Sequence, residues 1–203
     1  MSSFALWPLV ALGLAVVVVR QRAIAVGLVT VQALVLVASA LTDGTAASNI
    51  AAALALLARA LALAVLFFVL VSRTPESRPV RAGAGPLVRA TLAIGLALAL
   101  CWLVPRFGLG SRDAERASLT LVGFGLITAC MRRAILLQVL GIVLAENGLA
   151  MAALDLPGAP ALLIELGVAL DLTLIGLVAA AFHTRIFAEF GTGDSAVLGG
   201  LHD

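Results

Sequence analysis

Acidic side chains lie deep inside two apolar stretches of this 203-residue chain. Glu146 is near the middle of the stretch 134–154, Asp171 is near the middle of the stretch 160–182, and Glu165 lies between them. A charge at the centre of a bilayer costs about 2.5–3.5 kcal/mol on insertion-derived scales. Such residues therefore need either a charged partner or a function, and proton relays inside membranes are built from acidic side chains.

One cation lies at a comparable depth. Arg59 is near the centre of the apolar stretch 50–71. It could pair with one carboxylate as a buried ion pair that only fixes helix packing. Because one cation cannot neutralise three carboxylates, the surplus acids must be protonated or reached by water, and both conditions suit proton transfer. We expect Glu146 and Asp171 to carry protons, and Glu165 either to join them or to reach water at the membrane surface.

Three neutral polar residues accompany these charges. Gln32 lies in the middle of the stretch 23–41, Gln138 lies in the first half of 134–154, and Asn147 directly follows Glu146. Amide side chains inside membranes commonly form hydrogen bonds between helices, worth about 0.6 kcal/mol on average. We assign Gln32 to that role, and we expect Asn147 and Gln138 to line the surroundings of Glu146.

The composition identifies the elements that must position these residues. Hydrophobic residues make up 63% of the chain and charged residues 12%, whereas soluble domains are about 45–50% apolar and about 25% charged. A membrane-spanning helix needs about 20 apolar residues. The sequence therefore predicts an all-α integral membrane protein, a bundle of about seven transmembrane helices at 4–19, 23–41, 50–71, 87–104, 118–131, 134–154 and 160–182.

The arginines predict the orientation, because cytoplasmic loops of membrane proteins carry an excess of positive residues. With the N-terminus outside and the C-terminus in the cytoplasm, the outer connections contain Arg106, Arg112 and Arg116. The inner side then collects nine arginines: Arg20, Arg22, Arg73, Arg78, Arg81, Arg89, Arg132, Arg133 and Arg185.

Four segments follow from this division. Residues 1–71 form a segment of three helices, 72–86 a cytoplasmic loop rich in Arg, Pro and Gly, 87–187 a segment of four helices, and 188–203 a polar tail. Cys101 and Cys130 lie inside apolar stretches without metal-ligand spacing. We expect no metal, no cofactor and no nucleic-acid partner, and any redox chemistry must then belong to other subunits.

The second half of the chain resembles a known family. Residues 125–127 (GLI), the pair Arg132-Arg133, residues 135–149 (ILLQVLGIVLAENGL) and residues 163–172 (LIELGVALDL) are similar to hydrogenase-4 component E, a membrane subunit of complexes related to formate hydrogenlyase. Residues 118–187 also resemble the K subunit of NADH-quinone oxidoreductase and the C subunit of multisubunit cation/proton antiporters.

The resemblance implies a multi-pass subunit of a complex-I-like oxidoreductase in a bacterial inner membrane, with antiporter-like membrane subunits as partners. It also implies a place for Glu146 and Asp171 in a path for protons or sodium ions. Two alternatives remain open: a subunit of a cation/proton antiporter without a redox module, and a structural adaptor whose buried charges only set the helix register.

Overall fold

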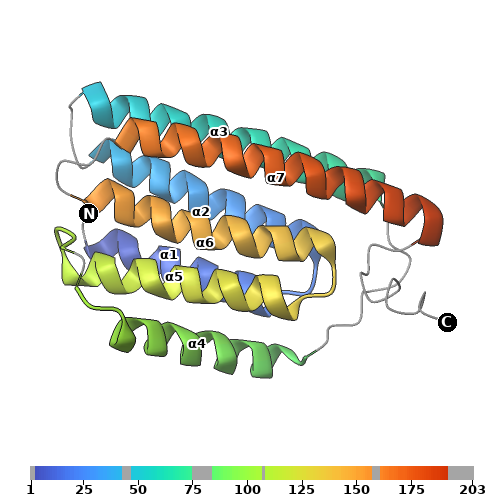
Figure 1. Ribbon diagram of the computed structural model, residues 1–203, viewed down its shortest axis with the longest axis horizontal. Helices are drawn as coiled ribbons and strands as arrows, with labels where there is room; N and C mark the ends of the chain where they lie inside the picture. Colours follow the sequence, from blue (N-terminus) through green and yellow to red (C-terminus); the bar gives the residue numbers. More distant parts are fainter. Residues whose placement is uncertain (1–2, 43–46, 75–83, 107, 157–160, 192–203) are drawn as a thin grey trace.

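The computed structural model describes residues 3–42, 47–74, 84–106, 108–156 and 161–191, with side chains at 6–42, 50–74, 84–106, 108–156 and 167–191. Arg78 and Arg81 of the predicted cytoplasmic loop and positions 192–203 of the predicted tail lie outside the described residues. Within those ranges the regular structure is helical (Figure 1). The helices are α1 (Ser3–Val18), α2 (Arg22–Thr42), α3 (Ala47–Arg73), α4 (Pro86–Leu103), α5 (Arg112–Met131), α6 (Ile135–Asp155) and α7 (Ala161–Phe190).

Six of the seven helices in the described ranges are long and apolar enough to cross a membrane. The exception, α1, has 16 residues, which at about 1.5 Å per residue span ~24 Å of a hydrocarbon layer ~30 Å thick. Each predicted apolar stretch coincides with one helix, so the predicted all-α bundle is confirmed. The orientation of the two termini across the membrane stays a prediction.

Helices α5 and α7 extend furthest beyond the apolar stretches that predicted them. α5 begins at Arg112 because the Ser111 hydroxyl caps it, accepting a hydrogen bond from the Ala114 N–H at 3.0 Å. Asp113 and Glu115 in its first turn complement the positive end of the helix dipole. α7 continues beyond the apolar layer until Gly191, which takes the left-handed conformation that ends many helices.

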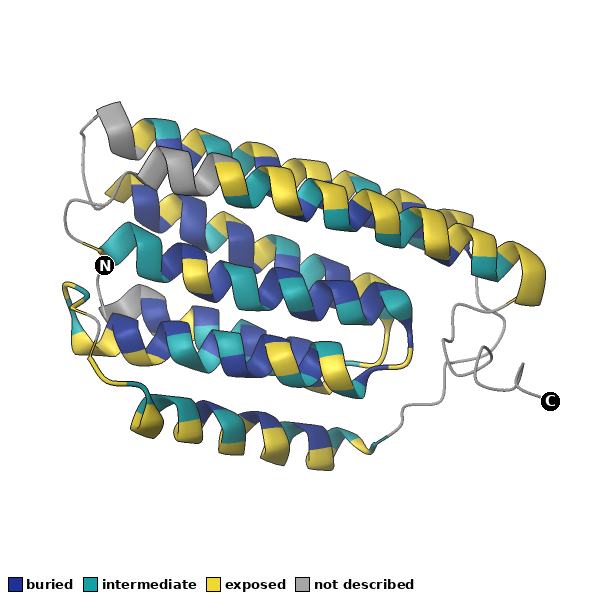
Figure 2. Cartoon of the chain, in the orientation of Figure 1, coloured by how far each residue is buried: buried dark blue, intermediate teal, exposed yellow. Residues whose placement is uncertain are grey.

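The helices form two layers (Figure 1). One layer contains α1, α2 and α3, and the other contains α4, α5, α6 and α7. Across the boundary α1 packs on α5, α2 on α6 and α3 on α7. α6 is the most buried span, whereas only small parts of α4 and α7 are covered, and the exposed positions of α4 and α7 are mostly apolar (Figure 2). An outer surface of this kind suits contact with lipid or with other membrane helices.

The closest helix contact is between α5 and α6, and glycines make it possible. A Cβ atom at Gly125 would lie 2.4 Å from the Ala145 nitrogen and 2.5 Å from the Gly141 carbonyl oxygen, and one at Gly141 would lie 2.5 Å from the Ala129 nitrogen. Near the opposite end the Ser118 hydroxyl donates to the Gly148 carbonyl at 2.8 Å. Small residues of this kind let helix backbones approach inside a membrane, and the contact fixes the position of α6.

Buried arginines complete the C-terminal end of the short helix α1. Arg132, between α5 and α6, donates to the carbonyls of Val16 and Val17 at 3.3 and 2.9 Å and also to that of Val19. Arg89 of α4 donates to the Val18 carbonyl at 3.4 Å. Burial lowers the pKa of Arg132 to about 10, with smaller contributions from the positive charges of Arg89 and Arg20. These cations pair with the last carbonyls and the negative dipole end of the helix.

Candidate functional site

Polar side chains from α2, α3 and α6 meet between the two layers, near the middle of each helix. Arg59 Nη2 of α3 donates to Asn147 Oδ1 of α6 at 3.2 Å, and Asn147 Nδ2 donates to Gln32 Oε1 of α2 at 3.1 Å. Gln32 Nε2 then donates to the Leu9 carbonyl of α1 at 3.0 Å. Arg59 is 3% exposed, and Asn147 and Gln32 are 0% exposed. We call these three side chains and the Leu9 carbonyl the polar chain.

The polar chain shows why a guanidinium can be held inside the bundle. A primary amide accepts through its oxygen and donates through its nitrogen, so Asn147 accepts a hydrogen bond from Arg59 and donates one to Gln32. Hydrogen bonds to a charged group contribute about 1.5–3 kcal/mol, which is comparable to the cost of placing that charge in a membrane. The predicted interhelical role of Gln32 and the predicted location of Asn147 beside Glu146 both belong to this one arrangement.

Glu146 lies on α6 between its buried and exposed sides. Asn147, the next residue, is fully buried, whereas Leu149 is 56% exposed and Glu146 itself is half-buried. Its Oε2 atom is buried and has no hydrogen-bond partner among the described residues. The charges of Arg59 and Asp171 both act on this carboxyl group. Glu146 thus lies within the electrostatic influence of both Arg59, inside the bundle, and Asp171, on α7.

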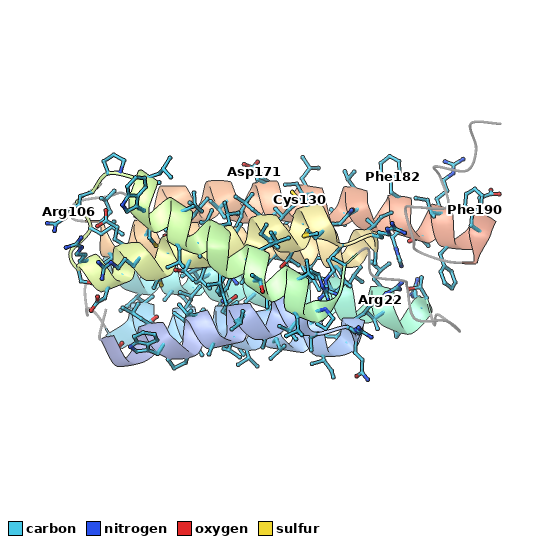
Figure 3. The ribbon with its side chains drawn as sticks, turned by 90° about the horizontal axis from the view of Figure 1, so that it is seen from below. Arg22, Arg106, Cys130, Asp171, Phe182 and Phe190 are labelled. Atoms are coloured by element: carbon cyan, nitrogen blue, oxygen red, sulfur yellow. The ribbon has the colours of Figure 1, made fainter. Side chains whose placement is uncertain are left out.

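Asp171 is exposed on the surface of α7. Figure 3 shows it projecting from the same edge of the bundle as Phe182. It lies ten residues after Ala161, the first residue of α7, which corresponds to ~15 Å along the helix axis. Asp171 is near the middle of the predicted span 160–182, and a carboxylate at the centre of a span costs about 2.5–3.5 kcal/mol in lipid. Glu165 belongs to the first turns of α7, but its side chain lies outside the described residues.

A small cavity adjoins the polar chain. It has a volume of about 20 Å³ and is bounded by α2, α3 and α6, which is room for one water molecule. Arg59, Asn147 and Thr30 supply its polar atoms, and the remaining lining is apolar: Val26, Val29, Ala33, Ala60, Leu63, Ala64, Phe67, Leu140 and Val143. A polar site of this size can hold a water molecule that contacts the guanidinium and the amide together.

The structure separates Gln138 from Glu146. Gln138 lies in the first turn of α6, where its Nε2 donates to the Arg132 carbonyl at 2.7 Å. It is two helical turns away from Glu146 along α6, at ~12 Å. Gln138 therefore completes the connection between α5 and α6, and it contributes nothing to the polar chain.

A buried histidine was not anticipated as part of the core. His183 is 0% exposed, and its Nε2 lies 3.2 Å from the Thr74 hydroxyl at the end of α3. Leu172 and Gly176 lie on the same side of α7 and are also buried against the bundle. The helical spacing of 172, 176 and 183 was the available signal, but it is hidden in a helix that is apolar on all sides.

This arrangement limits the chemistry that the site can perform. In the described part of the chain no three His, Cys, Asp or Glu side chains gather as a metal-binding group. The polar chain offers one fixed positive charge and two amides, and the adjacent Glu146 adds a half-buried carboxyl group. Such groups can hold, attract and exchange protons, since a carboxyl group is a proton donor in one state and an acceptor in the other.

The fold and the site define a multi-pass helical membrane protein with ionisable groups at the middle of its spans. No family model, no curated protein and no solved structure matches the chain.

Proposed function

We propose that the chain is a membrane subunit of a complex-I-like oxidoreductase of the hydrogenase-4 or formate-hydrogenlyase type, in a bacterial inner membrane with its N-terminus outside. Its role is to pass protons inside the membrane arm through Glu146 and Asp171, while partner subunits hold the redox centres. The resemblance of residues 135–149 and 163–172 to hydrogenase-4 component E supports the class of complex.

The position of Glu146 carries the proposal for proton transfer. The polar chain, with the cation Arg59, lies on one side of this residue. The exposed face of α7, with the acidic residue Asp171, lies on the other. A half-buried carboxyl group between a cation and an acidic residue is placed to accept a proton from one neighbour and donate it to another, which a proton carrier requires.

Arg59 would act as a fixed counter-charge in this scheme. Its hydrogen bond to Asn147, the residue next to Glu146, holds the guanidinium near the glutamate, where a positive charge can stabilise the glutamate anion. The cavity of about 20 Å³ beside Arg59 and Asn147 supports access by one water molecule.

The test is to replace the acids with neutral residues of the same shape in the assembled complex. Glu146→Gln and Asp171→Asn retain size and hydrogen-bonding capacity but remove the titratable proton. We expect near-normal assembly with reduced proton translocation, measured on the same membrane vesicles. Glu189→Gln, at the exposed end of α7, is the matched control and should translocate normally.

The alternatives give different outcomes in the same vesicles. An antiporter subunit would show translocation that depends on sodium and persists without an electron donor. A structural adaptor would show either unchanged translocation in both variants or loss of the assembled complex. Normal assembly together with normal translocation in the double variant would end the proton-carrier proposal.

A further inference from the structure

The exposed side of α7 has a defined composition. Asp171, Leu174, Val178 and Phe182 follow one another at three- and four-residue spacings, and all are exposed. Gly167 lies one turn before Asp171 on the same side, and a Cβ atom there would meet nothing within 4 Å. We call these five residues the α7 stripe. Residues three and four apart on a helix lie on one face, so the stripe is continuous.

Contacts with α3 prevent α7 from turning this stripe inward. Leu172 is fully buried, a Cβ at Gly176 would lie 3.1 Å from Leu66 of α3, and His183 contacts Thr74 beyond the end of α3. Rotation of α7 to hide Asp171 would expose His183 and break that contact. The carboxylate therefore remains on the surface of the bundle, near the middle of the predicted span 160–182.

The stripe combines two features of helix–helix contacts in membranes. A small residue allows a second helix to approach closely, and a polar residue hydrogen-bonds across the contact. Gly167 supplies the first feature and Asp171 the second, one helical turn apart. A surface that faced only lipid would need neither, and it would leave a carboxylate without compensation.

From these observations we infer that the α7 stripe docks a transmembrane helix of another subunit, and that this helix carries a lysine or arginine at the level of Asp171. A second copy of this chain cannot supply the cation. All 13 of its basic residues are arginines, and the one at mid-span, Arg59, is buried in the polar chain. Opposite charge is the chemistry that would recognise Asp171.

The inference deepens the proposed function and rests on it only for the presence of partner membrane subunits. Asp171 acts electrostatically on Glu146. A partner cation beside Asp171 would therefore place a second positive charge on the outer side of Glu146, opposite Arg59 on the inner side. The docked helix would then extend the path of ionisable groups from this chain into its neighbour.

The test uses the complex in its native membranes. A photo-crosslinking amino acid replaces Leu174 in the stripe or, as the control, Leu98, which is 66% exposed on α4. We expect position 174 to crosslink to another membrane subunit, within one turn of a lysine or arginine, and position 98 to give no such product. Crosslinks from 174 only to lipid, to a second copy, or to a helix without a basic residue would overturn the inference.

Two substitutions complete the test and separate it from the proton proposal. Gly167→Leu should lower the yield of the position-174 crosslink by about three- to tenfold, as expected for one lost helix–helix contact, whereas Gly95→Leu on α4, which also has open space, should not. Asp171→Arg should abolish the crosslink, and exchanging the partner's basic residue for aspartate should restore it. Failure of that rescue would count against docking, whereas intact docking with unchanged proton translocation in Glu146→Gln would count only against the proposed function.

Discussion

Arg59 and Asn147 lie 88 positions apart in the sequence, and they meet at 3.2 Å across the contact between α3 and α6. The guanidinium thus has an amide oxygen as its hydrogen-bond acceptor, while the neighbouring carboxyl group of Glu146 keeps one oxygen without a partner among the described residues. Through Asn147 the fixed charge is held close to the titratable group, which is the next residue of α6.

The first prediction concerns the polar chain. Asn147→Leu removes the acceptor of Arg59 and should lower the free energy of unfolding by about 1.5–3 kcal/mol, because a hydrogen bond to a buried charge is lost. Gln32→Leu breaks two hydrogen bonds between neutral groups, to Asn147 and to the Leu9 carbonyl, and should cost about 0.5–1.5 kcal/mol for each. Thermal unfolding in mild detergent measures both. If Arg59 depends on Asn147, the double variant Arg59→Met/Asn147→Leu should be less destabilised than the sum of its single variants.

A second prediction contrasts two glycines whose replacement by alanine should change the stability in opposite directions. Gly125→Ala places a methyl group 2.4 Å from the Ala145 nitrogen, which forces α5 and α6 apart, and overpacking of this kind costs about 1–3 kcal/mol. Gly95→Ala on α4 meets open space and should stabilise the helix by about 0.8–1 kcal/mol. Melting temperatures of the two purified variants should move in opposite directions. Equal shifts would contradict the close contact between α5 and α6.

The third prediction follows from the pKa of Arg132, which burial lowers to about 10. For a basic group a lowered pKa means that the folded state releases its proton first, so the unfolded state binds more protons between pH 10 and the ordinary arginine value. Stability contributed at this position should therefore rise as the pH passes above about 10. Arg132→Met removes this titration. The melting temperature of the wild type should rise relative to that of the variant between pH 9 and pH 11. A difference in melting temperature that stays constant over this range would contradict the lowered pKa of Arg132.

The fourth prediction tests orientation. Among the described residues seven arginines lie at the end that contains the start of α2 and the end of α7: Arg20, Arg22, Arg73, Arg89, Arg132, Arg133 and Arg185. In a variant without native cysteines, Arg106→Cys should react with an impermeant thiol reagent added from outside, and Arg20→Cys should not. Both sites are exposed, so access depends only on the side of the membrane. The reverse pattern would place the N-terminus in the cytoplasm.

The positions of the helices could be predicted from the sequence because the bilayer imposes a simple length requirement. The stretch 23–41 corresponds to α2 (Arg22–Thr42), and the stretch 87–104 corresponds to α4 (Pro86–Leu103). Every backbone polar group in lipid must be satisfied internally, so an apolar run of about 20 residues leaves helix as the available conformation. The unusual residues of the site, Glu146, Asp171 and Arg59, were recognisable for the same reason, since charge is costly in that setting.

The partners and the exposure of those residues depended on the tertiary structure. A helix that is apolar on every side contains no signal of which side it buries, so the sequence could not tell that Asn147 faces Arg59, that Glu146 lies half-buried beside it, or that Asp171 remains on the surface. Backbone contacts at Gly125 and Gly141 set the rotation of α6, and the packing of Leu172 and His183 sets that of α7. The sequence alone determined which residues needed an explanation. Packing between helices far apart in the chain decided which of them face one another, because it selects one rotation from many of nearly equal hydrophobicity.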